Sequence, residues 1–384
     1  MRECIAFVVH RYGREVNGGA EDECRGLAEH LSVKYDVEVL TSCSMNATPF
    51  DNGYPEGLST LDGVKVHRFL VEFDKNVKCR LEETLHDISC DEKKYIKDCG
   101  PYCPELVNYL EMNAKHYKAI IFFTSTTYIT TMGLLLDLDN SLLIPTMHED
   151  SGLEKKIYRK AIKRARGIIY NSIEERDYLS KNFDSANIPN CLTCMGIDAH
   201  NGPIDEALHE KYGRYILYAG RVSDGKNYSQ LNNYFIEYKK THKIPLKLVV
   251  IGRIDNFMRI VHHEDIHYLG FVSEDEKRAL MRCAEFLVLP SFNESLSIVV
   301  LESMMECSPV LVNGNCAVLK GQCLRSNAGL WYCDYNEFSL CMTFMLNHKD
   351  IRDEMGMNGK GFVQANYSWP SVTERISTFI ESVV

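Results

Sequence analysis

The feature of this sequence that most constrains its fold is a regular alternation of short apolar runs with longer amphipathic segments. Several runs consist almost entirely of Val, Ile, Leu and Phe, which is typical of strands buried on both faces. The segments between them carry apolar residues at helical spacing. Strands are expected at residues 4–10, 37–43, 119–124, 142–147, 167–171, 215–219, 246–251, 266–269, 285–289, 309–312 and 329–332. Helices are expected at residues 21–34, 154–166, 229–240, 274–283, 297–307 and 349–366.

Strand–helix alternation on this scale predicts an α/β protein with parallel sheets and right-handed crossovers. A chain of 384 residues exceeds the usual size of one hydrophobic core, so two domains are expected. The polar stretch at residues 196–213 carries Gly and Pro and precedes a fresh strand, which marks a boundary. The sequence therefore predicts two doubly wound, Rossmann-like domains facing a cleft, with ligands outside the carboxyl ends of the strands. Residues 45–104 are less regular and are expected to form excursions from the first sheet.

The composition excludes some classes of function. The formal net charge of −10 argues against a general nucleic-acid binder, because phosphate neutralisation needs a basic face. No run approaches the roughly 20 apolar residues that span a bilayer. The first residues have neither a basic leader nor a small-residue cleavage site, so they are interpreted as a strand and not as a signal peptide.

The fifteen cysteines are scattered, which favours a cytosolic protein with reduced thiols. The pairs Cys99/Cys103 and Cys191/Cys194 are close enough in sequence to hold zinc together. Neither has a second pair at a matching distance. Packing thiols are therefore favoured, and no metal site is predicted.

The strongest local motif is PSFNESLSIVVLESM at residues 290–304. A strand ends at its Pro-Ser pair, a polar turn follows, and a helix is expected to begin near Ser297. Free backbone N–H groups at a helix start favour a phosphate through hydrogen bonds and the helix dipole. Glu294 lies in the turn and Glu302 on the helix. If a nucleotide sugar lay with its diphosphate over the helix start, one of these carboxylates would meet the sugar and the other the ribose hydroxyls. A capped amphipathic helix with a solvated Glu explains this motif equally well by itself.

A second motif is YILYAGRVSDGK at residues 215–226, in which a strand ends just before Gly220. Arg221 and Lys226 follow the end of that strand. Two cations in this position suit a leaving diphosphate, because they offset the charge that develops as its bond breaks. A surface turn with two solvated cations is the alternative.

A third motif, NGGAE at residues 17–21, follows the first expected strand. The paired glycines Gly18 and Gly19 let a backbone approach a ligand closely, and the helix behind them offers N–H donors. A plain flexible turn is the alternative.

Taken together, these motifs resemble the retaining GT-B glycosyltransferases of family 4, the glycosyl transferases group 1. The segment RYGREVNGGAEDECRGLAEHL resembles the family's glycine loop and first helix, and YNSIEERDYL and MGID resemble the stretch before its interdomain linker. The segments YAGRVSDGK, LVVIG, YLGFV and PSFNESLSIVVLES then follow in the family's order, and Glu294 and Glu302 give its E-x7-E motif. The resemblance implies a Rossmann-like acceptor domain at residues 1–200 and a donor domain at residues 205–365. It also implies a C-terminal helix at residues 366–384 that crosses back to the first domain.

The resemblance implies a role for each matching residue. Arg221 and Lys226 would bind the diphosphate and stabilise its departure, while Glu294 would hold hydroxyls of the donor sugar. His148, in IPTMHED, would lie beside the reacting sugar, with a structural histidine as the alternative. The remaining donor-binding positions would be Gly18 and Gly19 at the phosphate or sugar, Phe271 and Val272 at the base, Leu296, Ser297, Ile298 and Val299 at the sugar and phosphate, and Glu302 at the ribose.

The implied activity is transfer of a hexose from a UDP- or GDP-linked sugar to an acceptor hydroxyl, with retention of configuration, in glycan, glycolipid or glycoprotein synthesis. We expect it to be independent of metal and of any cofactor other than the nucleotide sugar, since the two cations would replace a metal's electrostatic role. A sugar-nucleotide epimerase or phosphorylase on the same fold is the alternative, as is a non-catalytic glycan-binding partner subunit. Ser295 and Ser297 stand where the family has glycines, which narrows the donor pocket.

The run from Glu154 to Arg166 is basic in an otherwise acidic protein. It would face anionic lipid or a phosphorylated acceptor, and a solvated helix face is the alternative. The expected partners are therefore a nucleotide sugar and a glycan, lipid-linked or protein acceptor, without nucleic acid. The expected location is the cytoplasm, with a peripheral contact to the inner membrane face through this run.

Overall fold

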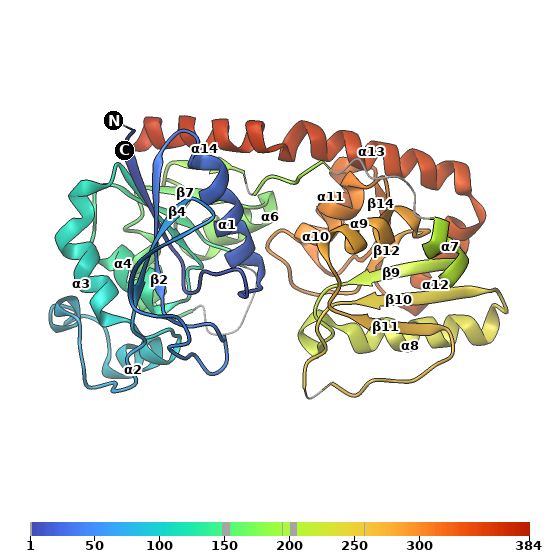
Figure 1. Ribbon diagram of the computed structural model, residues 1–384, viewed down its shortest axis with the longest axis horizontal. Helices are drawn as coiled ribbons and strands as arrows, with labels where there is room; N and C mark the ends of the chain where they lie inside the picture. Colours follow the sequence, from blue (N-terminus) through green and yellow to red (C-terminus); the bar gives the residue numbers. More distant parts are fainter. Residues whose placement is uncertain (1, 148–153, 194, 200–205, 257) are drawn as a thin grey trace. The chain divides into compact units, whose positions relative to one another are not determined.

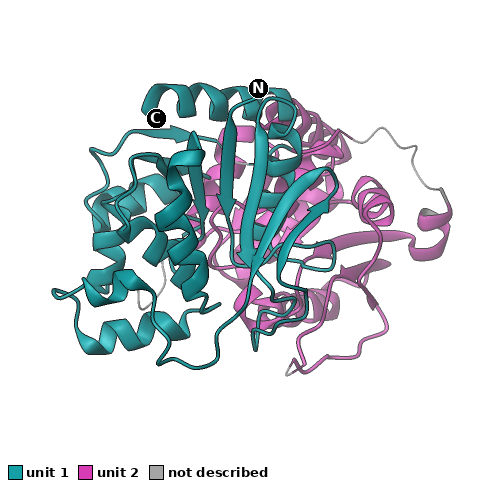
Figure 2. Cartoon of the chain, turned by 60° about the vertical axis from the view of Figure 1, so that its left-hand side comes forward, with its two compact units in different colours: residues 1–196, 369–384 teal, residues 197–368 magenta. Residues whose placement is uncertain are grey.

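The computed structural model describes residues 2–147, 154–193, 195–199, 206–256 and 258–384, and it divides into two compact units (Figures 1 and 2). Unit 1 consists of Met1–Gly196 and Trp369–Val384, and unit 2 of Ile197–Ser368. Each unit is built around its own sheet with helices on both sides. The predicted α/β architecture with two parallel-sheet domains is therefore confirmed. The expected first domain is residues 1–200, the second 205–365 and the returning helix 366–384. In the structure the chain passes from unit 1 to unit 2 after Gly196 and returns to unit 1 at Trp369.

Unit 1 contains an eight-stranded sheet in the order β3-β4-β2-β1-β5-β6-β7-β8. All neighbouring pairs are parallel except β3 with β4. Its strands are β1 (Cys4–Val8), β2 (Asp36–Ser42), β3 (Gly57–Leu61), β4 (Val64–Phe69), β5 (Ala119–Phe123), β6 (Ser141–Ile144), β7 (Gly167–Tyr170) and β8 (Asn190–Leu192). Its helices are α1 (Gly19–Leu31), α2 (Cys90–Asp98), α3 (Pro104–Asn113), α4 (Tyr128–Leu135), α5 (Lys156–Ile162), α6 (Ile173–Asn182) and α14 (Trp369–Val383), with short 3-10 turns η1 (Arg80–Glu83) and η2 (Ala114–His116).

Both faces of this sheet are buried, which explains the continuous apolar runs in the sequence. Along β1, Ala6 and Val8 join a core cluster with side chains of α3, α4 and α5. Ile5 and Phe7 point to the opposite face and join a cluster with side chains of α1 and α14. Every position of the strand is therefore selected for an apolar residue, as expected for parallel strands between two helical layers.

The expectation that residues 45–104 lie outside the sheet is wrong in part, because β3 and β4 form its edge. β4 pairs in parallel with β2, and β3 pairs with β4 as an antiparallel hairpin in which Leu61 lies opposite Val64. The turn residues Asp62 and Gly63 have φ angles of 49° and 84°. Positive φ at both central residues is the requirement of a type I′ turn, for which Asp-Gly is a favoured pair. That pair is the sequence signal that predicts the hairpin.

The basic run also differs from its expectation, since α5 is shorter than the helix predicted at residues 154–166. The helix ends at Ile162, and the Arg166 N–H then donates to the carbonyl of Ser141, 2.9 Å away, before β7 begins. Acidic side chains of unit 1 surround the run. Its ion pairs are Lys160–Asp87, Lys163–Asp184, Arg164–Asp137 and Arg166–Asp139.

Helix α14 brings the end of the chain onto unit 1. Trp369 at its start stacks on His30 of α1 with the ring centroids 3.7 Å apart. The same indole fills the space beside Gly26, where a Cβ would lie 2.6 Å from the ring. Near the other end of α14, Glu381 accepts a hydrogen bond of 2.7 Å from Lys118, which precedes β5.

Unit 2 contains a six-stranded, fully parallel sheet in the order β11-β10-β9-β12-β13-β14. Its strands are β9 (Arg214–Ala219), β10 (Leu246–Ile251), β11 (Ile266–Gly270), β12 (Leu287–Leu289), β13 (Val310–Asn313) and β14 (Gly329–Tyr332). Its helices are α7 (Glu206–Tyr212), α8 (Tyr228–Thr241), α9 (Glu274–Cys283), α10 (Ile298–Met305), α11 (Ala317–Ser326), α12 (Tyr335–Asn347) and α13 (Lys349–Tyr367), with a 3-10 turn η3 (Asp224–Lys226).

Each sheet has a topological switch point, where successive strands begin to add on opposite sides. In unit 1 it lies between β1 and β5, because β2 and β4 extend one way while β6 to β8 extend the other. In unit 2 it lies between β9 and β12 for the same reason. Ligands of open α/β sheets bind outside the carboxyl ends of the strands at such points. The fold therefore singles out two places to search for function.

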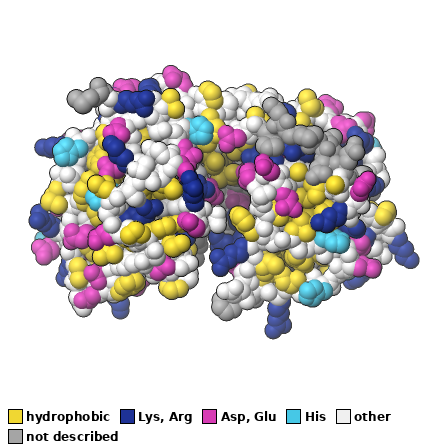
Figure 3. All heavy atoms as spheres, viewed as in Figure 1, with side chains coloured by type: hydrophobic (Ala, Val, Ile, Leu, Met, Phe, Trp, Pro, Cys, Tyr) yellow, Lys and Arg dark blue, Asp and Glu magenta, His cyan; other side chains and the backbone are white. Residues whose placement is uncertain are grey.

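The surface carries charges of both signs. Acidic and basic side chains are interspersed on the face drawn in Figure 3. Within the part of the chain that the structure describes, no helix is both long and apolar enough to cross a membrane.

Candidate functional site

The carboxyl edge of the unit 2 sheet is built from loops that need glycine. Gly220 follows β9 with a φ of 147°, and Gly252 follows β10 with a φ of 125°. L side chains rarely adopt either angle. A Cβ on Gly252 would lie only 2.0 Å from the carbonyl oxygen of Gly220. The two loops therefore pack backbone against backbone, which fixes the start of the segment that carries Arg221 and Lys226.

Lys226 and Glu294 come from the two loops of the β9/β12 switch point and form an ion pair. Lys226 Nζ lies 2.7 Å from Glu294 Oε1. The Lys226 side chain is 37% exposed and the Glu294 side chain 11% exposed. Because this shielding lowers the local dielectric, the attraction exceeds that of a fully solvated pair. The fold thus brings together the cation expected at the phosphate and the carboxylate expected at the sugar.

The carbonyl group of Pro290, just after β12, anchors the same loops. It accepts hydrogen bonds from the side-chain amides of Asn227 at 3.0 Å and Asn313 at 2.9 Å. Asn227 directly follows Lys226 and has a φ of 54°, a left-handed conformation that Asn tolerates better than most residues. These bonds tie the Lys226 loop to the ends of β12 and β13, so Lys226 is held by backbone geometry as well as by Glu294.

Helix α10 begins directly after this turn. Ser297 precedes it with a φ of 69°, a left-handed conformation that is uncommon for a residue with a side chain. The hydroxyl groups of Ser291 and Ser297 are buried and have no hydrogen-bond partner among the described residues. The carbonyl of Leu296 accepts a hydrogen bond from Gln322 of α11. The helix therefore starts in a strained, polar turn with N–H groups available to an anion.

Glu302 lies on α10 and is buried between cations of α9. Its Oε1 accepts hydrogen bonds from Lys277 Nζ at 2.9 Å and from Arg278 Nη2 at 3.4 Å. Burial opposes the charge on Lys277, but the charges of Glu302 and Glu274 outweigh it and raise the pKa of Lys277. The carboxylate expected at the ribose is thus already held by two cations that sequence reasoning missed. The sequence signal for these two cations is the segment EDEKRAL, in which Lys277 and Arg278 follow Glu274 at helical spacing.

The other predicted donor-binding residues of unit 2 lie on neighbouring loops. Arg221 is exposed, and its carbonyl accepts a hydrogen bond of 2.6 Å from the Tyr218 hydroxyl. Burial, reinforced by the charge of Glu294, raises the pKa of Tyr218. Phe271, just after β11, is 75% exposed, and Val272 is half-buried. Ile298 and Val299 open α10 and are half-buried.

The predicted residues of unit 1 lie around the start of α1. Gly18 has an extended backbone, and a Cβ there would lie 2.3 Å from Glu21 Oε2. Gly18 is therefore small because Glu21 occupies the space beside it. A Cβ on Gly19 would meet no atom of the described residues within 4 Å. His148 lies outside the described residues.

The cysteines considered for zinc are described only in part. Cys99 and Cys103 are free thiols, as is Cys191, and Cys194 lies outside the described residues. Among the described residues, no group of three or more His, Cys, Asp or Glu side chains is arranged to hold a metal ion. The sequence also contains one Asp-x-Asp, and both its acids, Asp137 and Asp139, pair with Arg166.

Known proteins resemble this chain in sequence and in structure. Residues 204–362 match the family model of the glycosyl transferases group 1. An uncharacterized glycosyltransferase of Methanocaldococcus jannaschii is 23% identical over an alignment of 405 residues, which covers 96% of each chain. The structure of sucrose-phosphate synthase from Thermosynechococcus elongatus has a TM-score of 0.75 to this chain at 16% identity, with 99% of both chains covered. Anabaena HepE, solved in complex with UDP-glucose, has a TM-score of 0.71 at 15% identity, with 99% of both chains covered. The predicted GT-B fold is confirmed by these structures.

Proposed function

We propose that this chain, as a group 1 glycosyltransferase of the GT-B fold, transfers a hexose from a nucleotide diphosphate sugar to an acceptor hydroxyl. The transfer would retain the configuration at the anomeric carbon. The acceptor would belong to glycan, glycolipid or glycoprotein synthesis. The observation that carries the proposal is the ion pair of Lys226 and Glu294 beside the start of α10. A cation, a carboxylate and a helix N-terminus at one switch point suit a phosphate and a sugar bound side by side.

In this proposal, the donor diphosphate lies at the N-terminus of α10. The N–H groups of its first turn and the helix dipole favour negative charge there. Lys226 and Arg221 add two positive charges from the loop after β9. Lys226 already pairs with Glu294, so the donor diphosphate would be a further anionic partner of Lys226. Glu294 then holds hydroxyls of the donor sugar, while Glu302 meets the ribose.

The chemical step breaks the bond between the anomeric carbon and the diphosphate oxygen and forms a bond from the acceptor oxygen on the same face. The acceptor proton goes to the departing phosphate, so nothing is oxidised or reduced. Charge grows on the diphosphate as its bond breaks, and Lys226 and Arg221 stabilise that charge. The proposal therefore assigns to these cations the electrostatic role that a metal has in other transferases, and it needs no cofactor.

The donor is proposed to carry UDP or GDP, and UDP is favoured because the similar Anabaena HepE was solved with UDP-glucose. The base would lie against Phe271 and Val272. Gly18 and Gly19 of unit 1, and His148, are proposed to meet the phosphate or the reacting sugar. The enzyme is proposed to act in the cytoplasm. Peripheral membrane contact through the run from Glu154 to Arg166 stays a hypothesis, and the ion pairs of that run weigh against it.

The test is turnover of a panel of nucleotide sugars by the full chain, with and without acceptors, followed by identification of the products. We expect glycosidic products with the donor's anomeric configuration and release of a nucleotide diphosphate. Glu294→Gln is expected to reduce this release about a hundredfold, because one preorganised electrostatic contact is lost. Glu237→Gln is the matched control, since it removes a Glu–Lys pair of 2.9 Å on the surface of α8.

Full activity of Glu294→Gln would refute the site assignment. A product that forms without any acceptor would instead indicate an epimerase.

A further inference from the structure

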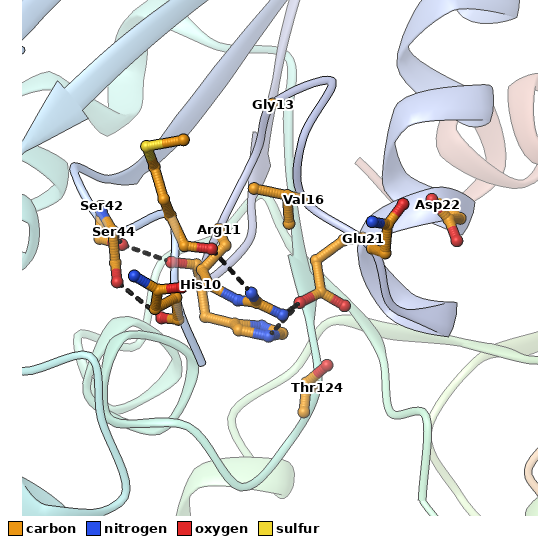
Figure 4. Close-up of polar contacts among 12 residues, drawn as sticks. His10, Arg11, Gly13, Val16, Glu21, Asp22, Ser42, Ser44 and Thr124 are labelled. Carbon is orange, nitrogen blue, oxygen red and sulfur yellow. Dashed lines mark hydrogen bonds and ion pairs between the residues drawn. The ribbon is translucent and has the colours of Figure 1, made fainter. Parts of the chain in front are cut away.

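The loop that joins β1 to α1, residues 9–18, is held by side chains more than by its own main chain. Among the described residues, the main-chain groups of residues 10–17 make one hydrogen bond to another main-chain group, from the Val16 N–H to the Gly13 carbonyl at 3.3 Å. Figure 4 shows the loop passing from β1 over Gly13 and Val16 to α1. A loop with so few bonds of its own would take many conformations. Its position is therefore decided by the side chains that contact it.

The start of this loop is anchored by α1 and β2. Glu21 of α1 lies 2.9 Å from Nε2 of His10 and also pairs with Arg11 (Figure 4). The carbonyl of His10 accepts a hydrogen bond of 2.6 Å from the hydroxyl of Ser42, at the end of β2. The first residues of the loop are therefore tied to their neighbours in unit 1.

The middle of the loop is held by a buried arginine of β4. Arg68 is 6% exposed, and its Nη2 donates to the carbonyl of Tyr12 at 2.9 Å. Its Nη1 donates to the hydroxyl of Ser59 on β3 at 2.7 Å, and its guanidinium lies 4.5 Å from the ring centroid of Tyr54. The Nε is buried without a partner among the described residues. These contacts are a carbonyl, a hydroxyl and an aromatic ring, none of which carries a charge.

Burial lowers the pKa of Arg68, so the fold keeps this charge at a cost in free energy. An apolar side chain of similar volume would support the sheet edge at a lower cost, since even a paired buried charge is often no better than a hydrophobic replacement. Residues that are kept against stability are typical of functional regions. The hydrogen bond to the Tyr12 carbonyl is the feature of Arg68 that an apolar residue cannot supply.

Tyr54, in the segment between β2 and β3, contacts both the loop and the arginine. A Cβ on Gly13 would lie 2.1 Å from the Tyr54 hydroxyl oxygen, so the loop can approach the ring only because residue 13 is glycine. The same hydroxyl donates to Glu15 Oε2 at 2.6 Å. The N–H of Tyr54 donates to the carbonyl of Cys43 at 2.8 Å, which fixes the segment on the end of β2.

The next residue of the loop is tied to the turn of the β3–β4 hairpin. Arg14 forms a bidentate pair with Asp62, in which its Nε lies 3.1 Å from Oδ2 and its Nη2 contacts Oδ1. Bidentate pairs fix the orientation of both groups. From α1, Arg25 donates to the carbonyls of Gly13 at 2.9 Å and Val16 at 3.4 Å. Successive residues of the loop are thus held by the hairpin and by the helix.

We propose that Arg68 is a positioning residue of the glycosyl transfer, which holds the β1–α1 loop on the β3–β4 hairpin so that Gly18 and Gly19 meet the donor at a fixed place. The inference rests on the proposed function, which assigns these two glycines to the phosphate or the reacting sugar. Arg68 acts through the Tyr12 carbonyl and touches no reacting atom. A main-chain contact to a reacting group must be placed within a fraction of an ångström, which a loop with one main-chain bond does not achieve by itself.

Hydrogen exchange tests the support of the loop without any reaction. In Arg68→Met, amide exchange in peptides that cover residues 12–18 should be about tenfold faster than in the wild type, because a hydrogen bond that holds the loop is lost. Arg68→Lys should restore part of the protection. Lys65→Met is the matched control, since it removes an ion pair of 2.7 Å with Asp36 from the other end of β4. Unchanged exchange in Arg68→Met would overturn the proposal.

Asp62→Asn is a second variant, whose fold does not depend on a buried charge. Asn-Gly suits a type I′ turn as well as Asp-Gly, so the hairpin is kept while the pair with Arg14 is weakened. We expect faster exchange in the same peptides, by a smaller factor than in Arg68→Met. An increase spread evenly over unit 1 would show a general loss of stability and would also overturn the proposal.

Turnover of a nucleotide sugar tests the role in transfer. Arg68→Met should lower kcat at least about tenfold and Arg68→Lys less, while the affinity for uridine stays within about twofold, because the base is assigned to unit 2. A merely structural role would lower the melting temperature and leave the kcat of the folded protein unchanged, which would refute the positioning role. If the wild type consumes no nucleotide sugar, the proposed function fails, whereas normal turnover by Arg68→Met overturns the role of Arg68 alone.

Discussion

Lys226 Nζ and Glu294 Oε1 lie 2.7 Å apart although 68 positions separate the two residues in the sequence. Strand β9 leads to the first residue and β12 to the second, and the two strands are neighbours in the sheet. Their carboxyl ends therefore deliver a cation and an anion to the same point, directly before α10. In the free protein each charge is the other's partner. A donor that brings both phosphate and sugar hydroxyls would give each of them a further partner.

The first prediction separates the phosphate from the base. Lys226→Gln should weaken binding of UDP about tenfold, since a charge-assisted hydrogen bond to the diphosphate is lost. Binding of uridine should not change, because uridine lacks the diphosphate. Isothermal titration calorimetry with both ligands measures the difference. Equal losses for UDP and uridine would contradict the assignment of Lys226 to the phosphate.

The second prediction concerns the strained start of α10. Ser297 has a φ of 69°, where glycine has no steric penalty. Ser297→Gly should stabilise the protein by about 1 kcal/mol, and Ser297→Val should destabilise it, because branching at Cβ worsens the left-handed strain. Thermal melts of the three proteins measure both effects. Destabilisation by both substitutions alike would show that the serine hydroxyl, and not the backbone angle, decides stability here.

The third prediction concerns pH and the buried carboxyl groups of unit 1. Burial raises the pKa of Glu23 to about 8 and that of Glu175 to about 8, from an ordinary value of 4.5. Between pH 4.5 and 8 these two groups therefore bind more protons in the folded protein than in the unfolded chain, so their contribution to stability falls as the pH rises through this window. Glu23→Gln should reduce the loss of stability with rising pH, because it removes one of the two titrating groups.

Melting temperatures of the wild type and Glu23→Gln between pH 5 and pH 9 measure this effect, and Glu237→Gln on the surface of α8 is the control. Glu175 also has a structural role, since its carboxylate accepts hydrogen bonds from the backbone N–H groups of Met147 at 2.6 Å and Asn171 at 2.8 Å. A wild-type protein whose melting temperature rises steadily from pH 5 to pH 8 would argue that both groups are ionised in the fold.

The fourth prediction concerns the cations around Glu302. Glu302→Ala should destabilise the protein by roughly 2–3 kcal/mol, because Lys277 loses its buried carboxylate and Arg278 loses one of its partners. Glu302→Gln should cost less, since its amide oxygen still accepts a hydrogen bond. Adding Lys277→Met to Glu302→Ala should recover part of the loss. Urea denaturation of the wild type, Glu302→Ala, Lys277→Met and the double variant gives the coupling energy, and purely additive effects would show that the pair contributes nothing.

The resemblance and the strand pattern predicted the α/β fold with two parallel-sheet domains, because local periodicity reports burial on one or both faces. The same reasoning missed the edge strand β3 and its neighbour β4, whose sequence signal is a single Asp-Gly turn. It also extended the helix at residues 154–166, because basic side chains form helices readily. The helix ends at Ile162, and Arg166 beyond it donates to the carbonyl of Ser141.

By itself, the sequence indicated most of the strands of the two sheets and some of the helices, and it carried the cations, acids and glycines of the candidate donor site. The tertiary structure decided which of these residues meet. Lys226 touches Glu294 because β9 and β12 are neighbours, and Glu302 is held by Lys277 and Arg278 because α9 packs on α10. His10, Arg11 and Glu21 meet because β1 and α1 bring the three residues together at the switch point of unit 1. Periodicity is a local property of the chain, whereas charge pairing depends on the order of strands in the sheet, which only the fold fixes.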